Sequence, residues 1–315
     1  MEVIKGWENV PDYLRGAYVT IGNFDGVHRG HQYIFSKLAK EAAKNKAPSV
    51  VITFDPHPKM VIHPEIRPFY LITILREKLE LIAQMGIEAC LVIPFDKAFA
   101  RITAGEFISR ILVEKFAVRK VIIGHDYTFG RGKEGNDVFL IREGKRLGFD
   151  VEVMEAFTLN GAVISSTEVR RAILAGEVGK AAHYLGRPYH VKGTVIEGHH
   201  RGQKLGFPTA NIAPEKELLP PDGVYAVKVL KNGNIYLGAM NIGTNPTFGD
   251  VARSMEVFLF DFEGDLYGET VEVFFIERVR EERKFPSVEE LVKQIAQDVA
   301  RTKEILSNLK DEFSS

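Results

Sequence analysis

The stretch GNFDGVHRGHQYIF, residues 22–35, decides how the first half of the chain is interpreted. It places two histidines, His28 and His31, in a glycine-rich turn between the apolar run AYVTIG (17–22) and a segment with apolar residues at helical spacing. A strand that runs into such a turn and then a helix suits phosphate binding, because glycine lets the backbone approach an anion and a helix start offers free N–H groups. Two imidazoles at i and i+3 lie on the same side of the first helical turn. The alternative is a glycine-rich turn that carries two surface histidines.

The composition is that of an ordinary globular protein. The chain has 315 residues, enough for two domains, with 45% hydrophobic and 26% charged residues. Its net charge of −1 provides no global basic field that would attract nucleic acid.

Cys90 is the only cysteine, which excludes an internal disulfide and a cysteine metal cluster and favours a reducing cytoplasm. The N-terminal residues lack the basic start and apolar run of a signal peptide. No apolar stretch approaches the ~20 residues that a membrane helix needs. We therefore expect a cytoplasmic protein without membrane association.

The first half alternates apolar runs with helical patterns, which predicts an α/β fold: a Rossmann-like parallel sheet with helices on both faces. Such sheets bind ligands beyond the carboxyl ends of their strands, where GNFDGVHRGH, FDPHP (54–58) and GHDYTFGRG (124–132) fall. Strands are expected at 17–22, 49–54, 89–95, 120–124 and 150–154, and helices at 31–45, 74–85, 104–116 and 136–147.

From about residue 190 the pattern changes to short apolar runs separated by turn residues, which predicts an antiparallel β-barrel. KNGN (231–234) and FEGD (262–265) are expected as hairpin turns. Ser287 and Glu290 form a capping-box signature for a final helix over 287–306. We place the domain boundary between residues 185 and 186, which gives domains 1–185 and 186–315.

A second phosphate signal lies in ISSTEVRR, residues 164–171. Ser165, Ser166 and Thr167 precede a predicted helix, and Arg170 falls in its first turn. The hydroxyl groups are either N-caps or, with the arginine, a grip for pyrophosphate. At the far end of a parallel sheet that already carries the histidine pair, the second interpretation is favoured.

The second half contains PTAN, residues 208–211, within GQKLGFPTANI. Thr209 and Asn211 supply hard oxygen atoms, which Mg²⁺ prefers, although a lone PTAN is also compatible with a turn and an N-cap threonine. Glu256 falls on a predicted strand face with Phe258, Phe260 and Phe262. An acid on an aromatic face is costly unless it lies at a sheet edge or in a site.

Together these motifs resemble one known family. GNFDGVHRGH, FDPHP, GHDYTFGRG and ISSTEVRR resemble the nucleotidyltransferase half of bacterial bifunctional riboflavin kinase/FAD synthetase, and PTAN resembles its kinase motif. The resemblance covers nearly the whole chain. It implies that the C-terminal domain phosphorylates riboflavin to FMN with ATP. The N-terminal domain then adenylylates FMN to FAD and releases pyrophosphate, with Mg²⁺ as the cofactor.

In the first domain the resemblance assigns His28 and His31 to the α-phosphate and the charge of the transition state. FMN is a phosphate monoester with a second pKa near ~6, so its phosphate is already anionic and needs no general base. The expected nucleotide- and phosphate-binding residues are Gly22, Asn23, Phe24, Asp25, Gly26, Asp126, Arg131, Ser165, Ser166, Thr167 and Arg170.

In the second domain the nucleophile is a neutral hydroxyl group, for which a carboxylate base is useful. The resemblance makes Glu256 that catalytic base. This chain has Phe258 where family members often carry a histidine two residues after the glutamate. Gly206, Pro208, Thr209 and Asn211 are expected to bind the nucleotide, with Thr209 and Asn211 as Mg²⁺ ligands.

Two loops complete the expected kinase site. Residues 198–206, with Arg201 and Lys204, form either a flap over the phosphates or a solvated basic loop. Residues 243–249 form a loop over the site.

Two other classes of protein fit part of the pattern. In the first, the N-terminal domain adenylylates another phosphate substrate and the barrel is a non-catalytic nucleic-acid-binding module, but HHRGQK is its only basic cluster and Glu256 has no role there. The second is a class I tRNA synthetase-like protein, against which the SSTEVRR helix argues. We expect the small molecules riboflavin, FMN and ATP as partners, and no nucleic acid.

Overall fold

The computed structural model describes residues 1–65, 68–159, 161–198, 206–244 and 253–308. The chain forms two compact units, Met1–Ser166 and Thr167–Ser315. This division lies before the expected boundary. Helices α6 (Ser166–Leu174) and α7 (Val178–Leu185) fall between the two positions, and α7 packs against strands of the barrel. The functional boundary between residues 185 and 186 stays a prediction.

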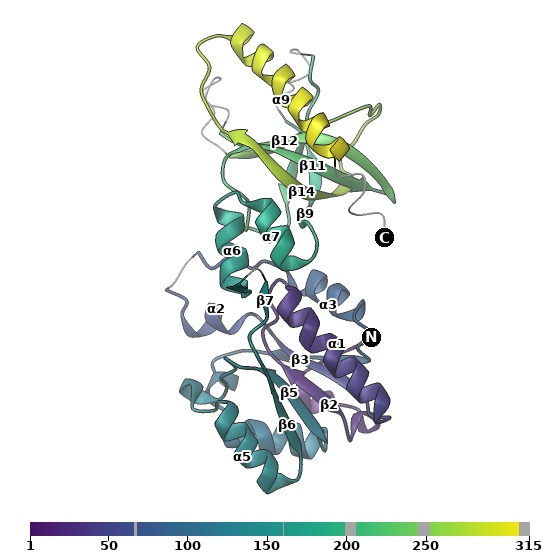
Figure 1. Ribbon diagram of the computed structural model, residues 1–315, viewed down its shortest axis with the longest axis vertical. Helices are drawn as coiled ribbons and strands as arrows, with labels where there is room; N and C mark the ends of the chain where they lie inside the picture. The colour runs from purple at the N-terminus through teal and green to yellow at the C-terminus, as the bar shows by residue number, and fades with distance from the viewer. Residues whose placement is uncertain (66–67, 160, 199–205, 245–252, 309–315) are drawn as a thin grey trace. The chain divides into compact units, whose positions relative to one another are not determined.

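The first unit is built on a six-stranded sheet in the order β1-β4-β3-β2-β5-β6, in which every neighbouring pair is parallel (Figure 1). The expected fold class is confirmed, and the N-terminal strand β1 adds an edge that the sequence pattern did not indicate, because only one of its four residues is buried. The strands are β1 (Glu2–Lys5), β2 (Tyr18–Ile21), β3 (Ser49–Asp55), β4 (Ala89–Pro94), β5 (Lys120–Gly124) and β6 (Asp150–Met154).

Helices cover both faces of this sheet because alternate strand residues are buried on opposite sides. Val51, Cys90 and Ile122 pack on one face with α1 and α3. Val50 and Leu91 point to the other face and pack with the helices over residues 104–115 and 137–147. The helices are α1 (Arg29–Lys44), α2 (Pro58–Ile62), α3 (Leu75–Ala83), α4 (Ala104–Glu106), a π-helical continuation (Phe107–Lys115) and α5 (Asp137–Leu147). A short hairpin, β7 (Thr158–Leu159) and β8 (Ala162–Val163), follows β6.

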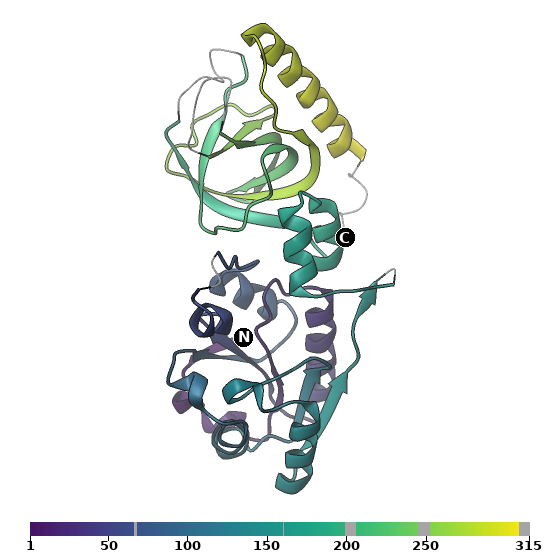
Figure 2. The same ribbon diagram turned by 90° about the vertical axis from the view of Figure 1, so that its left-hand side faces the viewer.

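The second unit contains a closed antiparallel barrel in the order β10-β13-β12-β11-β14-β9, with the final helix α9 (Val288–Asn308) packed on its outer face (Figure 2). The barrel and the final helix are confirmed. The strands are β9 (Tyr189–Ile196), β10 (Ala210–Pro214), β11 (Gly223–Lys231), β12 (Asn234–Gly243), β13 (Ser254–Leu259) and β14 (Thr270–Glu281).

One of the two expected hairpins forms. Lys231 pairs with Asn234 across a two-residue turn whose central residues, Asn232 and Gly233, have φ of 49° and 80°, as a type I′ turn requires. The hairpin expected at FEGD is wrong: β13 pairs with β12 and β10, whereas β14 pairs with β11 and β9. The segment between them crosses the barrel because two strands lie between its ends.

Among the helices of the described residues, none has both the length and the apolar character needed to cross a membrane.

Candidate active sites

The sheet order places the histidine turn at a topological switch point. From the central strand β2 the chain runs to β3 and β4 on one side and to β5 and β6 on the other. The carboxyl ends of β2 and β5 are therefore neighbours, and ligands of doubly wound sheets bind where the strand order reverses in this way. The turn at residues 22–28 and the segment 124–131 begin at these two ends.

The turn holds a strained conformation over residues 24–27. Phe24, Gly26 and Val27 have φ of 49°, 86° and 42°, which lie in the left-handed region. A Cβ at Gly22 would lie 2.8 Å from the Phe24 ring, so glycine is required there for the turn to close. The Phe24 ring is buried and makes an edge contact with His31 at a centroid distance of 5.1 Å. The side chain of Phe24 thus supports a histidine, and only its backbone is left for a phosphate.

Asp25 fastens the turn to the segment that precedes α3. Its carboxylate is 2% exposed and accepts hydrogen bonds from the N–H groups of Ile72 (3.0 Å) and Thr73 (3.1 Å). The Thr73 hydroxyl in turn accepts one from the Gly26 N–H at 2.9 Å. The Ser166 hydroxyl donates to the Asp25 carbonyl at 2.8 Å, so the two sequence motifs meet at this residue.

His28 and His31 lie together, as the sequence predicted. His28 is the N-cap of α1, and its ring stacks on that of His31 at 3.6 Å and 22°. Burial, followed by the charges of His28 and Lys78, holds the pKa of His31 well below 6.5. His31 is therefore neutral at neutral pH, with one N–H to donate.

The remaining candidates of the first site lie on three segments. Ser165 is half-buried next to Ser166, and on α6 Thr167 is exposed and Arg170 half-buried. After β5, Asp126 and Arg131 are both exposed, and Arg131 lies 4.0 Å from Glu134.

Sequence reasoning missed a buried lysine beneath the turn. Lys78 of α3 is 6% exposed, and its ammonium donates to the Thr53 hydroxyl at 3.3 Å. The Thr53 hydroxyl lies 3.3 Å from the Asn23 carbonyl, to which it donates. The one signal in the sequence is that Lys78 shares a helical face with Ile82, which is fully buried.

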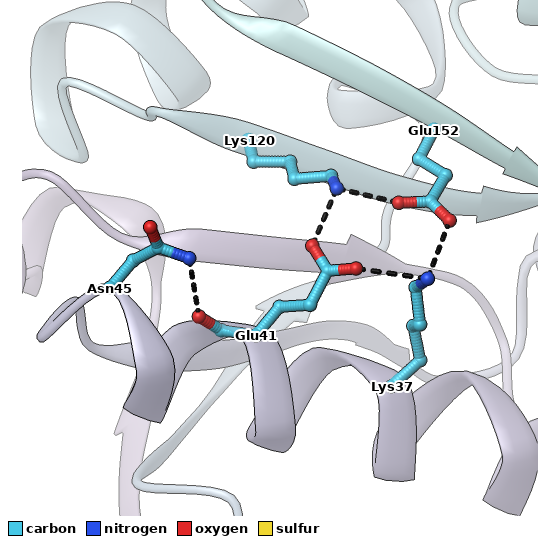
Figure 3. A network of polar contacts seen from close by, with 5 residues as sticks. All are labelled: Lys37, Glu41, Asn45, Lys120 and Glu152. Carbon is cyan, nitrogen blue, oxygen red and sulfur yellow. Dashed lines mark hydrogen bonds and ion pairs between the residues drawn. The ribbon is translucent and has the colours of Figure 1, made fainter.

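A four-residue ion-pair network holds α1, the helix that carries both histidines, against the sheet (Figure 3). Lys37 contacts Glu41 at 2.9 Å and Glu152 at 3.0 Å, and Lys120 contacts the same two carboxylates at 2.5 Å each. Burial alone raises the pKa of Glu41, but its hydrogen bonds to Lys120 and Lys37 outweigh burial and bring it below its usual value. The network joins α1 to β5 and β6, the strands beside the switch point.

In the barrel, three polar residues stand side by side on neighbouring strands. Asn211 of β10 and Asn241 of β12 are both directly opposite Glu256 of β13, so their side chains share one face. Met255 and Val257 are buried on the other side of β13, which places this row on the outer face of the barrel.

The surroundings of Glu256 exclude one of the two alternatives left open by the sequence, a position at a sheet edge. β13 lies between β10 and β12 in a closed barrel, so Glu256 is not at a sheet edge. The strand ends at Leu259, so Phe258 shares its face, but the expected Phe260 and Phe262 lie beyond the strand.

Two hydroxyl groups hold the Glu256 carboxylate. Ser254 donates to Oε1 at 2.9 Å and Thr209 donates to Oε2 at 3.4 Å. The Asn211 amide packs closely against Gly198, where a Cβ would overlap it. The structure thus brings Thr209, Asn211 and Glu256 together, and adds Ser254 and Asn241, which sequence reasoning missed because strand register is not visible in the sequence.

The other kinase candidates lie at the margin of this cluster. Gly206 has φ of 84°, and Gly206 and Pro208 are exposed. The expected flap residues Arg201 and Lys204, and residues 245–249 of the expected loop, lie outside the described residues.

The side-chain oxygen atoms of Thr209 and Asn211 fit Mg²⁺, which prefers hard oxygen ligands and keeps several waters. Within the described ranges, no three His, Cys, Asp or Glu side chains form a group that could hold a metal ion.

A histidine turn at the switch point of a parallel sheet and a Thr–Asn–Glu cluster on a barrel define a nucleotide-dependent transferase with two separate sites. Comparisons with known proteins agree. The family model described as FAD synthetase matches residues 10–168, and that described as riboflavin kinase matches residues 185–306.

Relatives match over nearly the full length. The bifunctional riboflavin kinase/FMN adenylyltransferase of Escherichia coli K12 is 39% identical, covering 96% of this chain and 97% of its own. That of Haemophilus influenzae is 40% identical, covering 96% and 98%. A crystal structure described as a macrolide-efflux protein from Streptococcus pneumoniae covers 100% of both chains with a TM-score of 0.85 and 32% identity. This chain belongs to the bifunctional riboflavin kinase/FMN adenylyltransferase family, as its motifs indicated.

Proposed function

We propose that this chain converts riboflavin to FAD in two ATP-dependent steps, as a riboflavin kinase in its C-terminal domain and an FMN adenylyltransferase in its N-terminal domain. The observation that carries the proposal is that the two family models match successive parts of the chain, and each part contains its own cluster of phosphate-directed residues. A nucleic-acid-binding barrel is not favoured, because it gives no role to the row Asn211–Glu256–Asn241.

For adenylylation, we assign His28 and His31 to the α-phosphate of ATP. The FMN phosphate oxygen attacks this phosphorus, a P–O bond to FMN forms, the bond to the bridging oxygen breaks, and pyrophosphate leaves. The nucleophile is already ionised, so the site needs alignment and charge stabilisation rather than a base. The stacked imidazoles donate N–H groups to the charge that develops on the α-phosphate oxygens.

The backbone of residues 22–26 completes this phosphate site in our proposal. Asp25 acts by position: its buried carboxylate holds the turn to Ile72 and Thr73 and so fixes the backbone of the turn. Ser165, Ser166, Thr167 and Arg170 are assigned to the pyrophosphate that leaves, and Asp126 and Arg131 to the margin of the nucleotide site.

For riboflavin phosphorylation, Glu256 is the proposed base. Its carboxylate accepts the proton of the ribityl hydroxyl while the oxygen bonds to the γ-phosphorus of ATP and ADP leaves. Thr209 and Asn211 would hold Mg²⁺, which when bound neutralises charge on the transferring phosphates. Gly206 and Pro208 are assigned to the nucleotide beside them.

The substrates proposed here are small molecules: riboflavin, FMN and ATP. The cytoplasmic location rests on the single cysteine, Cys90, and stays a prediction.

The direct test is to incubate the purified chain with riboflavin, ATP and Mg²⁺ and to separate the flavins by chromatography. We expect FMN to appear first and FAD to accumulate as FMN is consumed. A chain that converts supplied FMN to FAD but never phosphorylates riboflavin would contradict the kinase assignment.

A further inference from the structure

The strongest feature without an assigned role is the buried side chain of Lys78. A buried ammonium loses its hydration, which is costly unless nearby groups compensate for that loss. A methionine or leucine would fill the same helical position at no such cost, so the charge itself needs an explanation.

The hydrogen bonds of Lys78 lead to the phosphate turn. Its ammonium donates to Thr53 near the carboxyl end of β3, and Thr53 donates to the carbonyl of Asn23. Thr53 is fully buried, so this link runs through the protein interior. The link supports the turn from beneath, immediately before the left-handed residue Phe24.

The charged groups around Lys78 come from several elements. Burial lowers its pKa, while the carboxylates of Asp25 and Asp55, in the turn and at the end of β3, favour its charged form. Cys90 of β4 also faces it, but burial raises the pKa of that thiol to about 12, so it is neutral. The positive charge of Lys78 also acts on His31 and disfavours the protonation of its ring.

We propose that Lys78 is a positioning residue for FMN adenylylation, which fixes the phosphate turn through Thr53 and places a buried positive charge close to the histidine pair. The inference rests on the adenylyltransferase function proposed above. Two effects follow: the turn is held ready for the triphosphate, and the field of the ammonium attracts that anion while it keeps His31 a neutral donor.

Three variants test the two effects separately. Lys78→Met removes both the charge and the link, Lys78→Arg keeps the charge, and Thr53→Val keeps the charge but breaks the link. We expect Lys78→Met to reduce kcat/KM for ATP in FAD formation from supplied FMN by about tenfold to a hundredfold. We expect Lys78→Arg to restore part of this loss and Thr53→Val to cause a smaller one. Lys40→Met, which removes an exposed lysine of α1, is the matched control and leaves the rate unchanged.

Histidine NMR gives a readout that does not depend on activity. With the His31 signal assigned through His31→Gln, we expect the His31 pKa to rise in Lys78→Met and to stay in place in Thr53→Val. The fluorescence of Trp7, the only tryptophan, reports whether the first unit is folded.

The outcomes separate the two proposals. A folded Lys78→Met chain with the wild-type rate of FAD formation and an unshifted His31 would overturn the role of Lys78 alone. If Lys78→Met does not fold, wild-type rates in Thr53→Val would overturn it. A wild-type chain that forms no FAD from FMN and ATP would instead contradict the proposed function, and the inference with it.

Discussion

At the scale of single residues, Glu256, the proposed base, is fixed by two hydroxyl groups. Its two carboxylate oxygens lie within reach of the hydroxyl groups of Ser254 and Thr209, which hold it in one orientation on the outer face of the barrel. Phe258 lies two residues after Glu256, and Ser254, two residues before it, provides a hydrogen bond from the same strand face.

Glu256→Gln is expected to reduce FMN formation by about 10²- to 10⁴-fold, the usual contribution of a general base, while FAD formation from supplied FMN is unchanged. The amide oxygen of glutamine still accepts from Ser254 or Thr209, so the barrel should remain folded. Rates of both steps measured on the same preparation test this. Glu277→Gln, which changes an exposed acid of β14, is the matched control, and an equal loss of both activities in Glu256→Gln would count against the assignment.

The motif residues could be predicted from the sequence because glycines, histidines and hydroxyl groups at fixed spacing carry the chemistry locally. His28 and His31 meet as expected because residues i and i+3 adjoin on a helix. Lys78 and Asn241 could not be found this way, because their roles depend on which residues of distant strands end up next to them.

At the scale of elements, the fold depends on α1 being fixed to the sheet. The helix carries the histidines at its N-terminal end and the Lys37–Glu41–Lys120–Glu152 network farther along its length. Figure 3 shows the network and Asn45, which closes the C-terminus of the helix by donating to the Glu41 carbonyl at 2.9 Å. Lys120 and Glu41 are only 18% and 22% exposed, so their contact is less screened than a surface pair.

Lys120→Met is expected to destabilise the first unit by about 1–2 kcal/mol, between the values for exposed and buried ion pairs. Denaturant unfolding followed by Trp7 fluorescence measures this. The pKa values of Glu41 and Glu152 are lowered in the folded state, so the stabilisation is present above their ordinary value of 4.5 and is lost as the pH falls below it. The difference between wild type and variant should therefore shrink at acid pH. Arg76→Met, which breaks the exposed pair with Glu80 on α3, is the control, and a similar shift there would contradict a special role for the network.

The spacing of apolar residues predicted the buried strands and the amphipathic helices, because burial of either element requires apolar residues at a regular spacing in the sequence. It missed β1, whose edge position buries only Ile4, and it could not distinguish the π-helical turns of Phe107–Lys115 from an α-helix. The FEGD segment lies between strands that are not neighbours, because closure of the barrel decides strand order and local turn chemistry does not.

At the scale of the whole molecule, the chain joins two units with different chemical needs. The proposed site in the first unit, for an anionic nucleophile, has stacked imidazoles, a glycine turn and a buried lysine. The proposed site in the barrel, for a neutral hydroxyl group, has a carboxylate. The change of pattern near residue 190 revealed two domains in the sequence. The grouping of α6 and α7 with the barrel was not predictable, because it comes from tertiary packing of α7.

The central claim is that each half completes one reaction with its own residues, and mixing two defective chains tests it most directly. Glu256→Gln alone and His28→Ala alone should each fail to convert riboflavin to FAD, the first for lack of FMN and the second with FMN accumulating. We predict that an equimolar mixture of the two folded variants, supplied with riboflavin, ATP and Mg²⁺, forms FAD, because FMN released by one chain is adenylylated by the other. A mixture that forms no FAD, while the Glu256→Gln chain still adenylylates added FMN and the His28→Ala chain still releases FMN, would contradict the claim.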